Sequence, residues 1–160
     1  MIQAITETSF EAYLQTEDSR IDTNVASSNI RHLLKFTNDM DKSVVYAYGT
    51  TETIYDRYTA FTFTYHATPN IYHGKVDLKP SGFWKYEVYE VSWAGTVTLN
   101  SGNAPASETD VLSPAAPDKG VVQGLVTKGK LYLADKAGTA QVQYTQRQEP
   151  TGTNYIYYGQ

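Results

Sequence analysis

Residues 58–65 alternate between two kinds of side chain, and this alternation restricts the fold more than any other feature of the chain. Aromatic residues stand at positions 61, 63 and 65, and Ala or Thr stands at positions 60, 62 and 64. Successive side chains of a β-strand point to opposite faces of its sheet. The segment is therefore predicted to be a strand with one aromatic face, which requires a core beneath it.

Similar short runs of β-branched and aromatic residues, separated by turn residues, begin at residue 30. Such close spacing is typical of an antiparallel β-sandwich, and we expect that all-β fold, immunoglobulin-like or related. The expected strands cover residues 30–37, 43–48, 58–65, 75–78 and 83–93.

The run over residues 83–93 breaks its own alternation. Trp84 and Val88 share one face, whereas Tyr89 and Trp93 share the other, so the phase changes between Val88 and Tyr89. The change predicts either a β-bulge at that point or burial of both faces of the strand.

Residues 77–88 (DLKPSGFWKYEV) resemble a corner and strand of immunoglobulin-like sandwiches. There a tight glycine turn precedes alternating aromatic residues, and a tyrosine bonds back to the corner. The chain has no cysteine, so it lacks the Cys–Trp–Cys framework of that superfamily. The resemblance supports a sandwich without implying a function.

Acidic charge is concentrated in residues 1–29, which we interpret as an N-terminal arm. Residues 1–30 contain five acidic residues and one basic residue, so their net charge equals the −4 of the whole chain. Thr8 and Glu11 have the spacing of a capping box, which predicts a short helix with an apolar stripe of Phe10, Tyr13 and Leu14. The arm either packs on its own domain or becomes ordered against a neighbouring subunit.

The rest of the chain divides into three parts. Residues 30–99 form the expected sandwich, and residues 100–119, with three of the six prolines, form a connection. Residues 120–160 form a C-terminal β-meander extension. About forty residues bury too little surface to fold alone, so this extension should pack on the sandwich or on a neighbouring subunit. Its expected strands cover residues 121–127, 130–134, 140–145 and 155–158, with turns at residues 128–129 and 136–139.

Composition excludes several classes of function. The absence of cysteine excludes disulfides, thiolate metal sites and cysteine nucleophiles. Net charge is −4 and no basic run occurs, so we expect no specific nucleic-acid partner. No stretch is apolar enough to predict a membrane span, and we expect no membrane partner.

Motifs for catalysis are also missing from the sequence. It contains no Gly-x-Ser-x-Gly, phosphate loop or dinucleotide fingerprint. Glu87 and Glu90 fall on opposite faces of an unbroken strand, so they do not form the carboxylate pair of a glycosidase. We therefore expect no enzyme and no cofactor.

One set of metal ligands is conceivable in the sequence. His66, His73 and Asp77 would converge if the turn at residues 68–70 brings two strands together, and two imidazoles with a carboxylate suit a first-row metal. The alternative, polar residues of turns and strand edges, is favoured, so no metal site is predicted.

Tyrosine is the residue type that admits a functional interpretation. Outward positions are expected for Tyr46, Tyr48, Tyr55, Tyr58, Tyr72 and Tyr89. Exposed tyrosines suit protein interfaces and also stack on sugar rings, but they are common in strands without any function. The candidate interface residues are Phe10, Tyr13, Leu14, Tyr46, Tyr48, Tyr58, Tyr89, Tyr155, Tyr157 and Tyr158.

Four segments resemble a family of small structural proteins from tailed bacteriophages, especially phages of Bacteroidota and their marine relatives. The segments are residues 33–39 (LLKFTND), 80–90 (PSGFWKYEVYE), 122–132 (VQGLVTKGKLY) and 149–158 (EPTGTNYIYY). The resemblance carries no catalytic motif. It implies a virion component, made in the cytoplasm of the host bacterium.

The resulting expectation is a non-enzymatic virion structural protein present in many copies. The favoured role is an auxiliary or minor capsid protein (a decoration protein) that binds the major capsid protein, with the arm reaching a neighbour and an aromatic face adhering to the shell. The alternatives are a neck or tail component, and a carbohydrate- or receptor-binding β-sandwich module.

Overall fold

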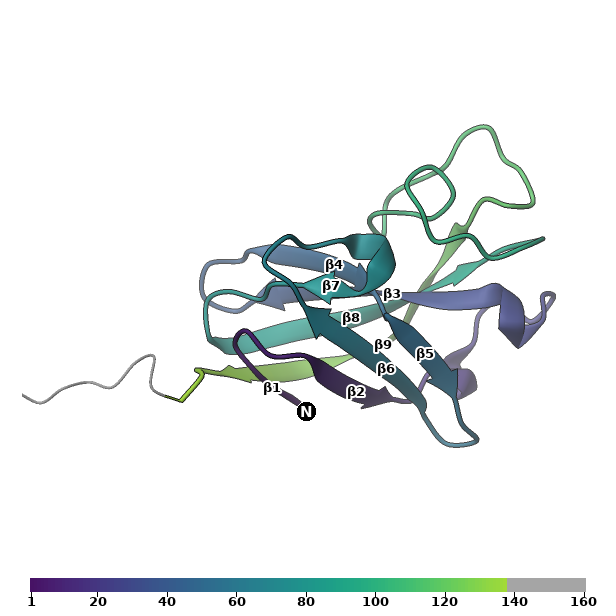
Figure 1. Ribbon diagram of the computed structural model, residues 1–160. Coiled ribbons are helices and arrows are strands. Elements are labelled where there is room, and N and C mark those ends of the chain that lie inside the picture. Colours follow the sequence, from purple (N-terminus) through teal and green to yellow (C-terminus); the bar gives the residue numbers. More distant parts are fainter. Residues whose placement is uncertain (138–160) are drawn as a thin grey trace, which may run out of the picture.

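The computed structural model describes residues 1–137 and confirms the all-β, sandwich-like fold (Figure 1). Two sheets pack face to face, and the only helices among the described residues are single 3₁₀ turns. These turns are η1 (Glu17–Ser19), η2 (Ser27–Asn29) and η3 (Ile71–His73).

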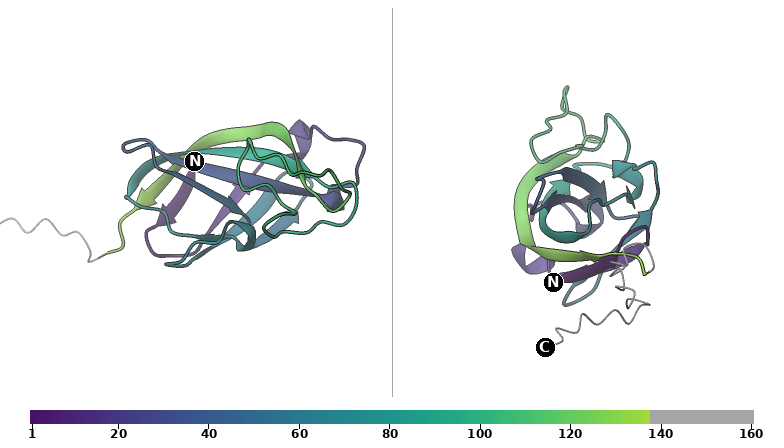
Figure 2. Two further views of the ribbon diagram at one scale, coloured as in Figure 1. Left: turned by 90° about the horizontal axis from the view of Figure 1, so that it is seen from above. Right: turned by 90° about the vertical axis from the view of Figure 1, so that its left-hand side faces the viewer.

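The first sheet has five strands in the spatial order β1-β9-β8-β3-β4. Neighbouring strands are antiparallel except β1 and β9, which are parallel. Figure 2 shows the long strand β9 curving around the side of the molecule. The strands are β1 (Ile2–Ile5), β9 (Val121–Ala134), β8 (Gly82–Ser92), β3 (Ile30–Asn38) and β4 (Val44–Tyr48).

The second sheet is smaller and has the order β2-β6-β5. Both of its main pairings are antiparallel, and the short strand β7 adds to the end of β6 in parallel. Its strands are β2 (Phe10–Leu14), β6 (Thr59–Tyr65), β5 (Thr51–Ile54) and β7 (Lys75–Val76).

The main core lies between the two sheets and contains the aromatic face expected for residues 58–65. Phe61 and Phe63 are fully buried, and Phe63 packs edge-on against Phe36 of β3, with ring centroids 5.5 Å apart. Trp84 of β8 and Leu131 of β9 complete the centre of this core. The prediction that this segment is a strand with its aromatic face directed into a core is therefore confirmed.

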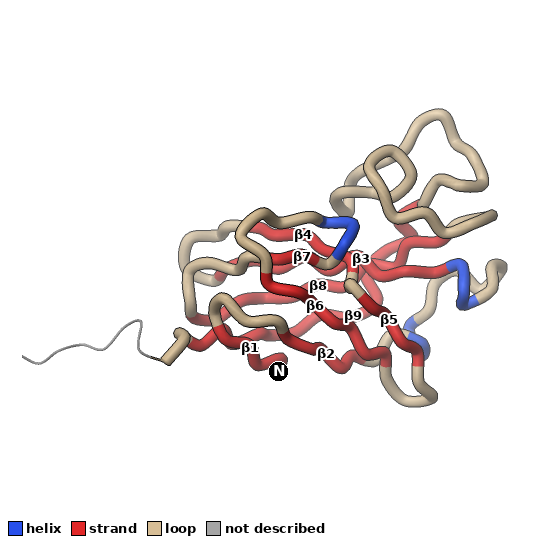
Figure 3. Tube along the Cα trace, in the orientation of Figure 1, coloured by secondary structure: helices blue, strands red, loops and turns tan. Residues whose placement is uncertain are grey.

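A second core covers part of the opposite face of the five-stranded sheet. Residues 94–120 have no regular structure and fold over this face, as the tan loop in Figure 3 shows. The indole N–H of Trp93 donates to Asn103 O at 3.2 Å, and the hydroxyl of Tyr48 donates to Pro105 O at 2.8 Å. Leu33 and Val91 are buried beneath the loop. The expected connection at residues 100–119 is therefore part of the packed domain.

Of the two expected explanations for the change of phase in β8, burial of both faces is the one that holds, because β8 itself alternates regularly and pairs with β3 without a shift of register. Pairing with β9 shifts register between Val88 and Tyr89, and again between Glu90 and Val91. The extra residues, Val126 and Gln123, lie in β9. Because the second core begins here, β8 is buried on both faces from Glu90 onward.

Residues 1–29 do not form a separate arm. Residues 2–5 and 10–14 are edge strands of the two sheets, and Ile2, Ala12 and Leu14 are buried in the main core. The helix predicted from Thr8 and Glu11 is wrong, because residues 10–14 pair with β6. Side chains at positions 11 and 13 point outward while those at 12 and 14 point inward, which is the period of a strand.

The hairpin predicted at Lys128 and Gly129 is also wrong, since β9 runs unbroken through both residues. Gly129 lies opposite Tyr86, and a Cβ at position 129 would come within 2.6 Å of the Tyr86 hydroxyl. The glycine therefore makes room for a ring. The strands expected at 140–145 and 155–158 lie outside the described residues.

The corner that resembles immunoglobulin-like domains is closed by a tryptophan. Trp84 Nε1 donates to the carbonyl oxygen of Pro80 at 3.0 Å, and Asn38 Nδ2 donates to the same oxygen at 3.4 Å. In immunoglobulin-like domains a tyrosine makes the bond back to the corner, and here Trp84 makes it instead. It fixes the entry of β8 into the five-stranded sheet.

Removal of residues 1–14 tests whether this segment is part of the domain. The deletion takes an edge strand from each sheet and uncovers the main core, so we expect loss of cooperative thermal unfolding, measured by circular dichroism. The exposed substitution Gln3→Ala in β1 is the control and should change stability by less than about 0.5 kcal/mol. An unchanged unfolding midpoint after the deletion would instead support the interpretation of this segment as an arm separate from the domain.

Candidate functional site

Three exposed tyrosines meet on the outer face of the second sheet, and we call Tyr13, Tyr55 and Tyr58 the tyrosine cluster. Tyr13 points outward from β2, because its neighbours Ala12 and Leu14 fill the core. Tyr55 and Tyr58 are the ends of the turn between β5 and β6, where Tyr55 N donates to Tyr58 O at 2.9 Å. The residue opposite Tyr13 in β6 is Ala60, whose small side chain leaves space for the rings.

The rings of the cluster contact one another and remain open to solvent. The ring centroids of Tyr13 and Tyr58 are 5.6 Å apart with nearly perpendicular planes, and those of Tyr55 and Tyr58 are 4.9 Å apart. Exposed fractions are 59% for Tyr13, 49% for Tyr55 and 40% for Tyr58. Centroid distances of this size leave no space for a ligand between the rings. The cluster therefore offers ring faces and edges to a partner.

Charged groups border the cluster on two sides. The Tyr13 hydroxyl donates a hydrogen bond to the Glu11 carboxylate, and that bond raises the pKa of Tyr13 above its ordinary value. Asp56 and Arg57 form the tip of the turn, and an open hollow of about 390 Å³ is lined by the turn residues and Ile54. The surface therefore combines exposed aromatic rings with hydrogen-bonding groups of negative and positive charge.

The remaining candidate interface residues that the structure describes are more deeply placed. Leu14 and Tyr48 are buried in the two cores, so neither is available to a partner. The outward position expected for Tyr48 is wrong, because residues 94–120 cover that face. Phe10, Tyr46 and Tyr89 are half-buried. Tyr155, Tyr157 and Tyr158 lie outside the described residues.

A second exposed aromatic pair was not predicted from the sequence. Phe83 of β8 and Tyr132 of β9 lie opposite each other on the five-stranded sheet, with ring centroids 5.1 Å apart and exposed fractions of 52% and 40%. The signal for Tyr132 was its outward phase between the buried residues Leu131 and Leu133. The pairing was not predicted because the expected hairpin at residues 128–129 divides β9 into two separate strands.

A charged group anchors the covering loop to the outer face of the five-stranded sheet. Glu108 accepts hydrogen bonds from Lys35 of β3 and from the Tyr46 hydroxyl of β4. Burial alone raises the pKa of Glu108, but these two bonds outweigh burial and hold the pKa below its ordinary value. Burial, together with the bond to Glu108, raises the pKa of Tyr46 to about 12.

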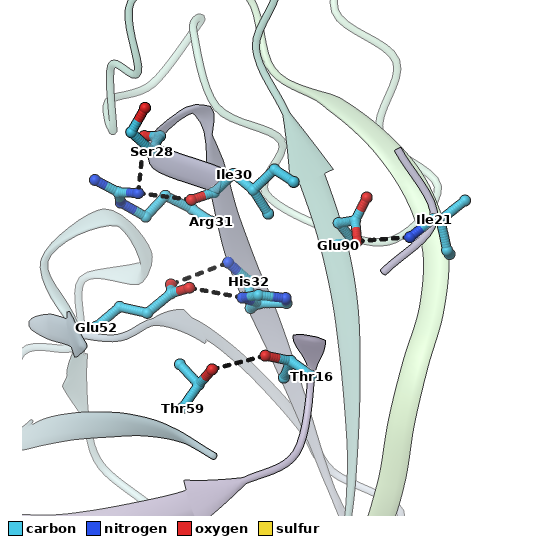
Figure 4. A network of polar contacts seen from close by, with 9 residues as sticks. All are labelled: Thr16, Ile21, Ser28, Ile30, Arg31, His32, Glu52, Thr59 and Glu90. Atoms are coloured by element: carbon cyan, nitrogen blue, oxygen red, sulfur yellow. Dashed lines mark hydrogen bonds and ion pairs between the residues drawn. The ribbon is translucent and has the colours of Figure 1, made fainter. Parts of the chain in front are cut away.

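Buried polar groups connect segments that are distant in sequence (Figure 4). Glu52 of β5 accepts from the backbone N–H of His32 at 3.1 Å, and its other oxygen lies 2.6 Å from His32 Nδ1. Glu90 is fully buried, and its carboxylate accepts from the backbone N–H groups of Ile21 and Asp22 at 2.9 and 2.7 Å. Both carboxylates are occupied by structural bonds, so their arrangement indicates support of the fold.

Two of the three residues considered for metal binding make other contacts. His66 Nδ1 accepts from Thr68 N at 3.0 Å, and Asp77 pairs with Lys79 at 2.9 Å. His73 belongs to η3, which follows the turn at residue 70. Within residues 1–137, no group of three His, Asp or Glu side chains is placed to hold a metal ion.

Comparison with known protein families, with curated proteins and with solved structures finds no match for this chain. In the part of the chain that the structure describes, no helix is long and apolar enough to cross a lipid bilayer. The tyrosine cluster is therefore assessed on its geometry and chemistry.

Substitution of Glu108 tests the loop anchor through its pH dependence. Because the folded-state pKa of Glu108 is lowered, its contribution to stability is present above the unfolded pKa and is lost as pH falls through the folded value. Glu108→Gln should lower the free energy of unfolding by about 1 kcal/mol near neutral pH and by much less near pH 3. Urea denaturation at both pH values measures this difference.

The control for the loop anchor is Asp56→Asn, at an exposed turn far from the loop. It should leave the free energy of unfolding nearly unchanged at both pH values. A loss for Glu108→Gln that is equally large at both pH values would contradict the assignment to an ionised anchor.

Proposed function

We propose that this protein is a non-enzymatic structural subunit of a larger protein assembly, and that it binds its partner through the tyrosine cluster. The observation that carries the proposal is the contact among Tyr13, Tyr55 and Tyr58 on an exposed sheet face. Tyrosine is enriched among the residues that dominate binding energy at protein interfaces, because it buries much area at a small cost in side-chain entropy.

The assembly we propose is the virion of a tailed bacteriophage, with a capsid decoration role preferred over the neck or tail. This part rests on the resemblance of four segments to small phage structural proteins. Three of them, residues 33–39, 80–90 and 122–132, fall on the adjacent strands β3, β8 and β9. The resemblance thus concerns the scaffold of the five-stranded sheet, whereas the tyrosine cluster is the feature that would select the partner.

The scaffold changes how the N-terminal segment takes part in this proposal. Residues 1–14 contribute two strands to the domain, so they are not free to reach a neighbour. The other part of the proposal, adhesion through an aromatic face, is kept. The face that we propose is the outer face of the second sheet with its turn at residues 55–58, on the side away from the covering loop.

Tyr58→Ala tests the proposed interface, and Tyr132→Ala is its matched control. Both residues are 40% exposed, but Tyr132 lies on the other sheet. Loss of a central aromatic residue should weaken binding to the candidate capsid protein by about 30-fold, equivalent to about 2 kcal/mol. The control should change the dissociation constant by less than about threefold.

Titration of each purified variant against assembled shells, followed by sedimentation, gives the dissociation constants. Light scattering of the protein alone supplies its mass. A monomer that joins only shells supports decoration, whereas a closed ring favours the neck or tail. If Tyr58→Ala binds shells as tightly as the unmodified protein, the tyrosine cluster is not the interface.

A carbohydrate-binding module is the second candidate, favoured by the charged tip of the turn. Asp56 and Arg57 stand between Tyr55 and Tyr58 and line the same hollow. A pyranose ring stacked on a tyrosine would find hydrogen-bond partners there.

Glycan-array binding tests this second candidate. If the site binds sugar, Arg57→Ala and Tyr58→Ala should both abolish the array signal, with Tyr132→Ala unchanged. An empty array, or binding indifferent to both changes, removes the candidate.

A further inference from the structure

Acidic residues outnumber basic residues around the tyrosine cluster. Residues 10–19 and 51–65, which include the three main strands of the second sheet, contain five acidic residues and one basic residue. One of the acids, Glu52, is turned inward to His32 and is almost fully buried. The other four still outnumber the one base, so this part of the chain carries an excess of negative charge.

Three exposed carboxylates border the cluster. Glu11 belongs to the same outward-facing row of β2 as Tyr13 and accepts a hydrogen bond from its hydroxyl. Asp18 accepts from Gln15, which continues this exposed row beyond the end of β2. Asp56 lies in the turn that carries the other two tyrosines. Negative charge therefore borders the rings both along β2 and at the turn.

These three carboxylates differ from the other surface acids in having no cation beside them. Within residues 1–137, neither Glu11, Asp18 nor Asp56 takes part in an ion pair, although Arg57 follows Asp56 in the turn. Elsewhere on the described surface, lysines pair with acids at five places. The paired acids are Glu7, Asp39, Asp77, Glu87 and Glu108.

The exposed pair of Phe83 and Tyr132 shows the contrast. The next residues along the same outward rows of β8 and β9 are Lys85 and Lys130, which lie opposite each other. These lysines already pair with Glu87 and Asp39. Aromatic rings are thus exposed on both sheets, but those of the tyrosine cluster adjoin carboxylates without a cation.

The ring faces of the cluster are also open to a cation. Among residues 1–137, the cation that lies over an aromatic ring is Lys35, whose Nζ is 5.9 Å from the ring centroid of Tyr46 on the other sheet. The face of a tyrosine ring carries negative potential that attracts a guanidinium or ammonium group. The hydrogen bond to Glu11 and the charge of Glu11 raise the pKa of Tyr13, because they disfavour a second negative charge. The same charge favours a cation beside the ring.

We propose that the tyrosine cluster receives an arginine side chain of the partner subunit, whose guanidinium stacks on the exposed ring of Tyr13 and donates hydrogen bonds to the Glu11 carboxylate. This inference rests on the proposed function and names the residue that the partner presents. Arginine fits better than lysine because its planar group stacks on a ring and bonds a carboxylate at the same time. The Glu11 carboxylate, which already accepts from Tyr13, has lone pairs left for these bonds.

The probes are N-acetyl-arginine amide and N-acetyl-citrulline amide, which has a similar shape but no charge. NMR titration of the full chain follows the ring signals of Tyr13 and Tyr58. We expect the arginine compound to bind in the millimolar range and the citrulline compound at least about fivefold more weakly, because it lacks the cation–π attraction and the ion pair.

Substitutions assign this binding to the two groups. Glu11→Gln and Tyr13→Ala should each weaken binding of the arginine compound by about fivefold, whereas Tyr13→Phe, which keeps the ring face, should retain most of it. The matched control is Asp118→Asn, which removes the same charge from an exposed position of the covering loop and should leave binding unchanged. All four positions are exposed or keep their strand, so unchanged unfolding midpoints by circular dichroism verify the fold.

Three results would overturn the inference: equal binding of the two compounds, binding of neither, or binding indifferent to Glu11→Gln. Shell binding separates this failure from failure of the proposed function. Loss of shell binding on Tyr58→Ala with indifference to Glu11→Gln rejects the arginine and keeps the tyrosine interface. Indifference to both changes rejects both, and loss with both supports both.

Discussion

The fold depends on the burial of both faces of the five-stranded sheet where the end of β8, from Glu90 onward, pairs with the start of β3. Leu33 and Leu34 are adjacent in β3 and point to opposite faces, yet both are fully buried, as are Trp84 of β8 and Trp93, which directly follows that strand. A single sandwich core would leave one residue of each pair in water. Residues 94–120 therefore act as a third layer, anchored by bonds from Trp93, Tyr48 and Lys35. This layer leaves the second sheet as the open side of the molecule.

The buried carboxylates of Glu52 and Glu90 lie where regular strand pairing is interrupted inside the packed structure. Where β4 ends at Tyr48, the backbone N–H of His32 has no ladder partner, and Glu52 accepts from it. Where β9 bulges beside Glu90, the carboxylate of Glu90 accepts two N–H groups of the segment before β3. An unsatisfied buried N–H costs about 1–3 kcal/mol, so these two acids stabilise places where regular pairing stops. Their chemistry is that of capping groups.

Local patterns predicted the strands that carry long alternations and failed where tertiary pairing decides. The strands β3, β4, β6 and β8 and the irregularity at Val88 followed from period and residue type. The short strands β1, β2 and β5 did not, because four or five residues carry too little pattern and are fixed by their partners. The turn predicted at Gly129 is wrong because the sequence does not distinguish a glycine that makes room for a ring, here that of Tyr86, from a glycine that allows a turn. Of the candidate site, Tyr13 and Tyr58 were named, but their contact required the pairing of β2 with β6.

The open side of the molecule has a physical consequence for binding. Three tyrosine rings that contact one another lose little further freedom when a partner covers them, so burial of their exposed area is opposed by a small entropy cost. The covering loop lies on the opposite side of the five-stranded sheet and would not have to move.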